Sequence, residues 1–138
     1  MNPQPRDLEQ HLLSALSAAL AQECGHATAP AVVVLFGSRA RGRARAQSDV
    51  DVGIALDAPL DETIRQRLEA AIAAALKIDV DLVDLLSAPS HLVSQALRHG
   101  RILRGAGTPA LGAIIAKMVA EREDIAPYQR RILEERAR

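Results

Sequence analysis

The stretch VVVLFGSRARGRARAQSDVDVGIAL, residues 32–56, decides the fold of this chain, because two apolar runs enclose a Gly-Ser corner and an alternating pair of aspartates. The first run, residues 32–35, is β-branched and apolar, which predicts a buried strand that ends in a tight turn at Gly37 and Ser38. Glycine lets the backbone come close to a ligand, and a serine that caps a short helix leaves its hydroxyl and backbone N–H groups facing an anion. The corner therefore predicts a phosphate site.

Asp49 and Asp51 begin the second apolar run. A strand has a side-chain period of two, so both aspartates share one face and Val50 and Val52 share the other. Neighbouring carboxylates repel each other unless a cation lies between them, and Mg²⁺ prefers carboxylate oxygens together with nucleotide phosphates. The pair therefore indicates a magnesium-nucleotide site.

Four arginines, Arg39, Arg41, Arg43 and Arg45, precede these aspartates with no acidic residue among them. They are either a solvated loop or a clamp for a triphosphate, whose oxygens match guanidinium groups in geometry and charge. The sequence does not distinguish the four from one another.

Composition limits the classes of function. The 138 residues suffice for one domain, and 17 basic against 17 acidic residues argue against binding long nucleic acid through its phosphates. Cys24 is the only cysteine, which excludes a disulfide or a zinc cluster within one chain. No signal peptide or membrane-spanning run is visible, so we expect a soluble, cytoplasmic protein with no membrane partner and no stable nucleic-acid partner.

Hydrophobic periodicity predicts helices over residues 7–23, 61–76, 91–99 and 111–119, and a third strand over residues 77–86. In that strand Asp79 and Asp81 share one face, while Asp84 faces the other way and can cap the turn before Ser87. Gly100 is expected to end its helix in the left-handed conformation.

The pattern of Gly-Ser, ten residues and Asp-x-Asp resembles the nucleotidyltransferase signature of the DNA polymerase beta superfamily. The motif GSRARG, residues 37–42, is similar to that of the minimal nucleotidyltransferase (MNT) proteins within it. The resemblance implies an α/β fold of the minimal polymerase-beta type, a small mixed sheet with flanking helices. It also implies a third carboxylate on the next strand. Asp81 is the first choice, because VDLVDL at residues 80–85 is similar to the motif found at this place in MNT proteins, and Asp79 is the alternative.

The chemistry implied by this resemblance is nucleotidyl transfer from ATP. Asp49, Asp51 and Asp81 would be the catalytic residues and hold Mg²⁺, with Asp81 nearest the attacking hydroxyl. The nucleotide-binding residues would be Gly37, Ser38, Arg39 and Arg41, all within the motif.

The resemblance also implies a partner, since MNT proteins of this size commonly act as antitoxins. They pair with a HEPN-domain ribonuclease toxin, and similar antitoxins transfer AMP to a tyrosine hydroxyl of that toxin. We expect residues 1–105 to form the MNT domain with an N-terminal helix, and residues 106–138 a helical extension. The apolar face over residues 111–119 would dock the toxin, pair with a second copy or pack on the core. The alternative functions are a non-catalytic antitoxin that acts by binding, and transfer of a nucleotide to a small molecule.

Overall fold

The computed structural model describes residues 5–25, 29–37 and 50–121. Their helices and strands, in chain order, are α1 (Pro5–Cys24), β1 (Val32–Phe36), β2 (Val50–Ala55), α2 (Glu62–Leu76), β3 (Val80–Asp84), α3 (Ser90–His99), β4 (Arg101–Arg104) and α4 (Pro109–Glu121). None of these helices is both long and apolar enough to cross a membrane.

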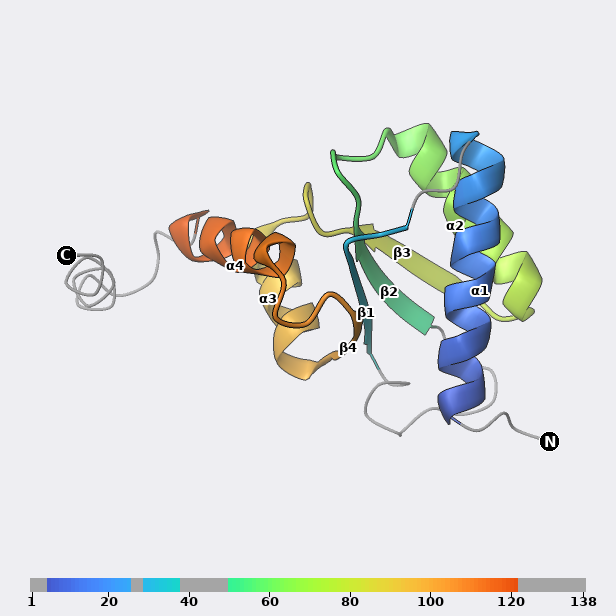
Figure 1. Cartoon of the computed structure of the whole chain (residues 1–138), viewed down its shortest axis with the longest axis horizontal. Helices are drawn as coiled ribbons and strands as arrows, with labels where there is room; N and C mark the ends of the chain where they lie inside the picture. Colours follow the sequence, from blue (N-terminus) through green and yellow to red (C-terminus); the bar gives the residue numbers. More distant parts are fainter. Residues whose placement is uncertain (1–4, 26–28, 38–49, 122–138) are drawn as a thin grey trace.

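The strands form one mixed sheet in the order β3-β2-β1-β4 (Figure 1). β1 runs antiparallel to both β2 and β4, whereas β2 and β3 are parallel and are joined by the crossover helix α2. The predicted fold class, a small mixed sheet with flanking helices, is confirmed. β4 is a strand that the sequence did not reveal, because Arg-Ile-Leu-Arg is too short to show a period and becomes extended only by pairing with β1.

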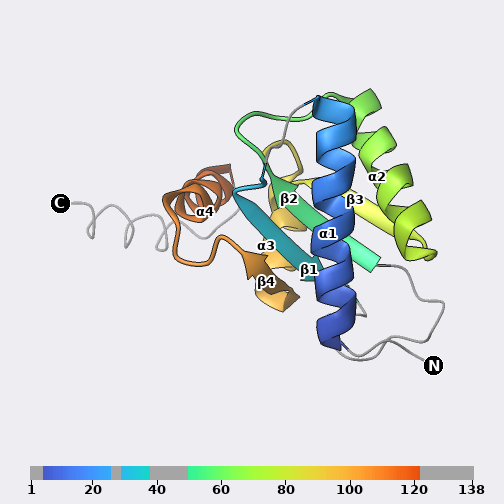
Figure 2. The same ribbon diagram turned by 45° about the vertical axis from the view of Figure 1, so that its right-hand side comes forward.

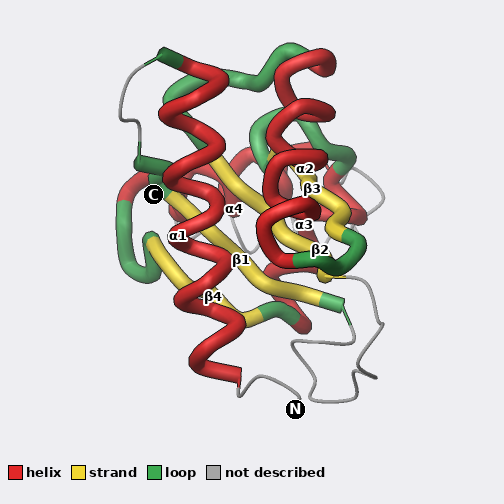
Figure 3. The backbone as a smooth tube through the Cα atoms, turned by 90° about the vertical axis from the view of Figure 1, so that its right-hand side faces the viewer, coloured by secondary structure: helices red, strands yellow, loops and turns green. Residues whose placement is uncertain are grey.

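Helices cover the sheet on both faces. Helices α1 and α2 lie on one side of the strands in Figures 1 and 2, and Figure 3 views the molecule from that side, with the strands behind the two helices. Leucines of α1 pack there with alternate strand residues, among them Val33, Val50 and Val52. The predicted alternation along β2 is thereby confirmed, and Asp51 must face the opposite side.

Helices α3 and α4 cover that opposite face. Val93 of α3 and Leu111 and Ile114 of α4 are buried with Val32 and Val34 of β1. The next residue of α4, Ile115, is 41% exposed. Because Leu111 and Ile114 of α4 are buried in the same apolar cluster as residues of β1, this helix contributes to the core. The division of the chain at residue 105 stays a prediction.

The ends of two helices differ in how well the sequence predicted them. The Asp61 carboxylate accepts a hydrogen bond from the Thr63 N–H at 2.8 Å and so caps α2, as predicted. The prediction of a left-handed Gly100 is wrong, since its φ is −89°. A glycine is needed there because a Cβ would overlap the Ala96 carbonyl oxygen and lie 3.0 Å from that of Leu35. Close packing of α3 against β1, not chain reversal, therefore selects this residue.

Candidate functional site

The topology brings three predicted site residues to one end of the sheet. Because β1 and β2 are antiparallel, the last residue of β1, Phe36, pairs with Asp51 near the start of β2. Because β2 and β3 are parallel, Asp51 pairs with Asp81 near the start of β3. Paired residues of neighbouring strands point to the same face, so the two carboxylates lie side by side, next to the turn at Gly37.

Gly37 is in direct contact with Asp51. Its φ is +81°, in the left-handed region that favours glycine. A Cβ built on Gly37 would overlap the Oδ2 atom of Asp51 and lie 3.0 Å from its Cγ. The glycine was expected to let the backbone approach a ligand, and the structure shows that it lets the backbone approach this carboxylate.

The register separates the two candidates for the third carboxylate. Asp79 precedes β3, and its backbone carbonyl accepts a hydrogen bond from the Val50 N–H at 2.9 Å. Asp81 lies within β3, is exposed, and is the residue paired with Asp51. The strand therefore places the Asp81 carboxylate, and not that of Asp79, beside Asp51.

Asp84 has a structural role. It is 5% exposed, and its carboxylate accepts hydrogen bonds from the Leu60 N–H, the Leu86 N–H and the Ser87 hydroxyl at 2.8, 3.0 and 2.8 Å. These contacts join the loop before α2 to the turn after β3. The prediction that Asp84 faces away from the site and caps the turn before Ser87 is confirmed.

The comparison with known families agrees with this geometry. The profile described as polymerase beta, nucleotidyltransferase matches residues 19–106, which include all four strands and both described carboxylates. The chain belongs to the polymerase beta nucleotidyltransferase family. Asp51, Asp81 and Gly37 thus lie in the part of the chain that the family matches.

One curated relative is the protein adenylyltransferase MntA of Shewanella oneidensis, which is 39% identical over 74 residues. The match covers 54% of this chain and 53% of that protein, about half of each.

Two similar crystal structures are of toxin-antitoxin complexes. One contains AMP-PNP and has a chain that is 26% identical with a TM-score of 0.66. That match covers 91% of the present chain and 98% of the chain in the complex. The other is an MntA–HepT complex with a chain that is 25% identical with a TM-score of 0.62. That match covers 94% of the present chain and 99% of the chain in the complex.

Four other predicted site residues, Ser38, Arg39, Arg41 and Asp49, lie outside the described residues. Within residues 5–25, 29–37 and 50–121, no three acidic, histidine or cysteine side chains gather as a metal-ligand group. The predicted trio includes Asp49, so its convergence stays a prediction. The described pair fits a divalent cation in two respects: both donors are carboxylates, and Asp81 is open to solvent.

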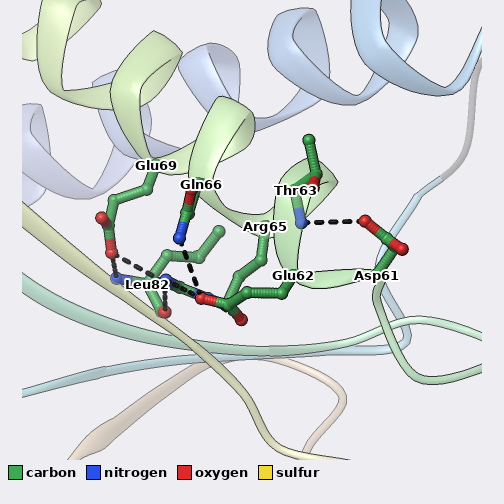
Figure 4. A network of polar contacts seen from close by, with 7 residues as sticks. All are labelled: Asp61, Glu62, Thr63, Arg65, Gln66, Glu69 and Leu82. Carbon is green, nitrogen blue, oxygen red and sulfur yellow. Dashed lines mark hydrogen bonds and ion pairs between the residues drawn. The ribbon is translucent and has the colours of Figure 1, made fainter.

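A polar network that the sequence analysis missed joins α2 to Leu82, the residue after Asp81 (Figure 4). Arg65 of α2 bonds to Glu62 at 2.7 Å and to Glu69 at 2.9 Å, and its Nη1 also donates to the Leu82 carbonyl. The hydrogen bond to Glu62 is the main cause that raises the pKa of Arg65, and the same bond lowers the pKa of Glu62. The i,i+3 spacing of Glu62 and Arg65 and the i,i+4 spacing of Arg65 and Glu69 could have predicted ion pairs along the helix. That spacing does not show that the side chains also contact β3.

Proposed function

We propose that this chain is a Mg²⁺-dependent nucleotidyltransferase that transfers AMP from ATP to a tyrosine hydroxyl of a partner HEPN-domain ribonuclease toxin and so neutralises it. The observation that carries the proposal is the pairing of Asp51 with Asp81, beside Gly37, inside the region matched by the nucleotidyltransferase family. Two carboxylates side by side supply the oxygen ligands that a divalent cation prefers. Their place in the region matched by the nucleotidyltransferase family supports a catalytic role.

Each residue has a role in this reaction. Gly37 and Ser38 would seat the outer phosphates, with Arg39 and Arg41 pairing with their oxygens. Asp49, Asp51 and Asp81 would hold Mg²⁺, which when bound withdraws charge from the phosphates. The Asp81 carboxylate, on the solvent side of Asp51, would accept the proton of the attacking hydroxyl. A bond then forms between the tyrosine oxygen and the α-phosphorus. The bond between the α-phosphorus and the oxygen that bridges the α- and β-phosphates breaks, and pyrophosphate leaves.

The comparisons support the donor and the acceptor. The curated relative is named a protein adenylyltransferase, and the two similar structures are toxin-antitoxin complexes, one of them with the ATP analogue AMP-PNP. More than nine-tenths of the chain matches one chain of each of these toxin-antitoxin complexes. A protein acceptor is therefore favoured over a small molecule, and we place the reaction in the cytoplasm, where ATP is supplied.

The test is to co-express the chain with the protein encoded beside it and to measure the intact mass of the purified partner. We expect the partner to carry AMP-sized additions with the wild-type chain, and none with Asp51→Asn or Asp81→Asn. Asp57→Asn is the matched control, because Asp57 is an exposed aspartate that follows the other end of β2, and it should leave the additions unchanged.

Two outcomes would change the conclusion. A partner that is inactive but unmodified with the wild-type chain would establish the non-catalytic antitoxin instead. A partner that is modified equally by wild type and Asp51→Asn would refute the assignment of the carboxylates.

A further inference from the structure

The outer edge of the sheet at β3 is closed by side chains of α2. β3 is an edge strand, and such strands leave the backbone groups of alternate residues without a neighbouring strand. The Leu82 N–H donates to Glu69 Oε2 at 2.8 Å, and the Leu82 carbonyl accepts from Arg65 Nη1 at 2.7 Å. Figure 4 shows Arg65 and Glu69 reaching from α2 to the backbone of Leu82. These two side chains replace the missing strand at one residue.

This residue is next to the candidate catalytic carboxylate. The N–H that Glu69 binds belongs to the peptide group that joins Asp81 to Leu82. On the inner side, β2 pairs Asp51 with Asp81, and the Leu82 side chain is 1% exposed in the core. The backbone at Asp81 is therefore held from both sides, while its side chain stays exposed.

Arg65 and Glu69 form one unit. Arg65 Nη1 lies 2.9 Å from Glu69 Oε2, the same oxygen that accepts from Leu82, so the two side chains and the Leu82 backbone form a closed ring of contacts. The Arg65 and Glu69 side chains are 20% and 28% exposed, which shields their bonds from solvent in part. Glu62 also binds Arg65, but its side chain is 67% exposed, and within the described residues its hydrogen bonds join it to Arg65 and Gln66 of its own helix.

We propose that Glu69, supported by Arg65, is a positioning residue that fixes the Asp81 carboxylate for the transfer of AMP. The inference rests on the proposed function, because it assigns Asp81 to the reacting site. Catalytic groups must be held closely, and a displacement of about 1 Å can lower a rate about a hundredfold. An edge strand that carries a catalytic carboxylate needs such support, and in the described part of the chain the support comes from these two residues.

A purely structural role is the alternative, in which the network only stabilises β3 or blocks the addition of another strand. The two roles differ in one respect. A positioning residue acts through the Asp81 carboxylate, so its removal has no further effect when that carboxylate is already missing. A structural residue affects every variant of the chain alike.

The experiment measures the rate of AMP transfer to the co-purified partner for Glu69→Ala, with Glu62→Ala as the matched control on the same arginine. We expect Glu69→Ala to lower kcat about tenfold, the usual effect of removing a supporting residue, with the KM for ATP unchanged. Glu62→Ala should leave both constants unchanged. Glu69→Gln keeps an oxygen that can accept from Leu82 and should restore most of the rate.

The decisive comparison uses the Asp81→Asn background and measures the affinity for Mn²⁺, because Asp81→Asn is expected to transfer no AMP. Glu69→Ala should weaken Mn²⁺ binding in the wild-type background and cause no further loss of affinity in the Asp81→Asn background. An equal loss of affinity in both backgrounds, or no loss in the wild-type background, would overturn the proposal.

The second measurement does not depend on catalysis. Mn²⁺ is titrated into each full-length variant in the presence of AMP-PNP, and exchange of the Leu82 amide hydrogen is followed by NMR. Glu69→Ala should weaken Mn²⁺ binding about tenfold and speed exchange at Leu82, and Glu62→Ala should do neither. Should the wild-type chain transfer no AMP, the proposed function fails while this measurement still tests the positioning of Asp81. An Mn²⁺ affinity that is unaffected by Glu69→Ala, or no Mn²⁺ binding by wild type, would overturn the proposal.

Discussion

Replacing Gly37 by alanine tests the contact between the turn and Asp51, one of the two proposed catalytic carboxylates. The new methyl group lowers the stability of the folded state in two ways. The φ of +81° is unfavourable for any residue with a Cβ, and the Cβ would overlap the Asp51 carboxylate. The first cost is common to all left-handed glycines, whereas the second is specific to this site.

The two costs can be separated within this chain. Gly107 has a nearly identical φ of +77°, and a Cβ there would meet no atom within 4 Å. Gly107→Ala therefore measures the conformational cost alone, about 1–2 kcal/mol. Gly37→Ala should cost as much plus about 1–3 kcal/mol for overpacking, unless Asp51 moves aside. If Asp51 moves, the extra cost appears as lost activity instead of lost stability.

The assay compares both variants by urea unfolding and by AMP transfer to the co-expressed partner. We expect Gly107→Ala to lose stability and keep the wild-type rate. Gly37→Ala should lose at least as much stability and about a hundredfold in rate, because a carboxylate shifted by about 1 Å no longer aligns the reactants. Equal stability and equal rates for the two variants would refute the view that the turn at Gly37 is fitted to Asp51.

Three further predictions concern stability. Asp84→Ala removes the acceptor of three hydrogen bonds in a buried place and should lower the free energy of unfolding by roughly 3 kcal/mol, measured by urea titration, whereas a loss below about 1 kcal/mol would contradict the structural role of Asp84. Lys77 ends α2 with a φ of 58°, so Lys77→Gly should raise the free energy of unfolding by about 0.5–1 kcal/mol, and a lower melting temperature would count against this reading. The hydrogen bond from Arg65 lowers the pKa of Glu62, so ionised Glu62 stabilises the folded state. This stabilisation is fully present above the ordinary pKa of a glutamate and is lost as the pH falls through the lowered pKa. The difference in urea unfolding midpoint between wild type and Glu62→Gln should therefore become smaller in acid. A difference that stays constant from pH 7 to acid would show that the charge of Glu62 does not contribute to stability.

Much of the fold could be predicted because its patterns are local. Valines alternate with aspartates in β2, and leucines recur every fourth residue in α1, so the buried face of each element was visible in the sequence. Asp61 and Asp84 were predicted to cap the segments that they do cap, since such bonds join neighbours in the chain. Element type and local capping follow from short-range chemistry.

Long-range placement was less accessible. A period of two assigned Asp79 and Asp81 to one face but did not show which of them pairs with Asp51. That register depends on how the crossover through α2 positions β3. A local sequence pattern does not predict this long-range placement. Gly100 illustrates the same limit: its position suggested a left-handed helix end, but packing against the Leu35 carbonyl is what requires a glycine.

The proposed catalytic role of Asp81, on an edge strand, gives a reason for the polar residues of α2 that contact the sheet. In the proposed reaction the Asp81 carboxylate meets both a metal ion and the hydroxyl of another molecule, so it has to be accessible, and the edge strand β3 provides that access. The same position leaves β3 without strand partners on its outer side in the described sheet, which would leave the carboxylate poorly fixed. Glu69 and Arg65 restore these contacts at Leu82 without covering Asp81, since they bind from the edge while the side chain of Asp81 projects from the face. Access and rigidity, which conflict in an ordinary edge strand, are thereby combined at one residue.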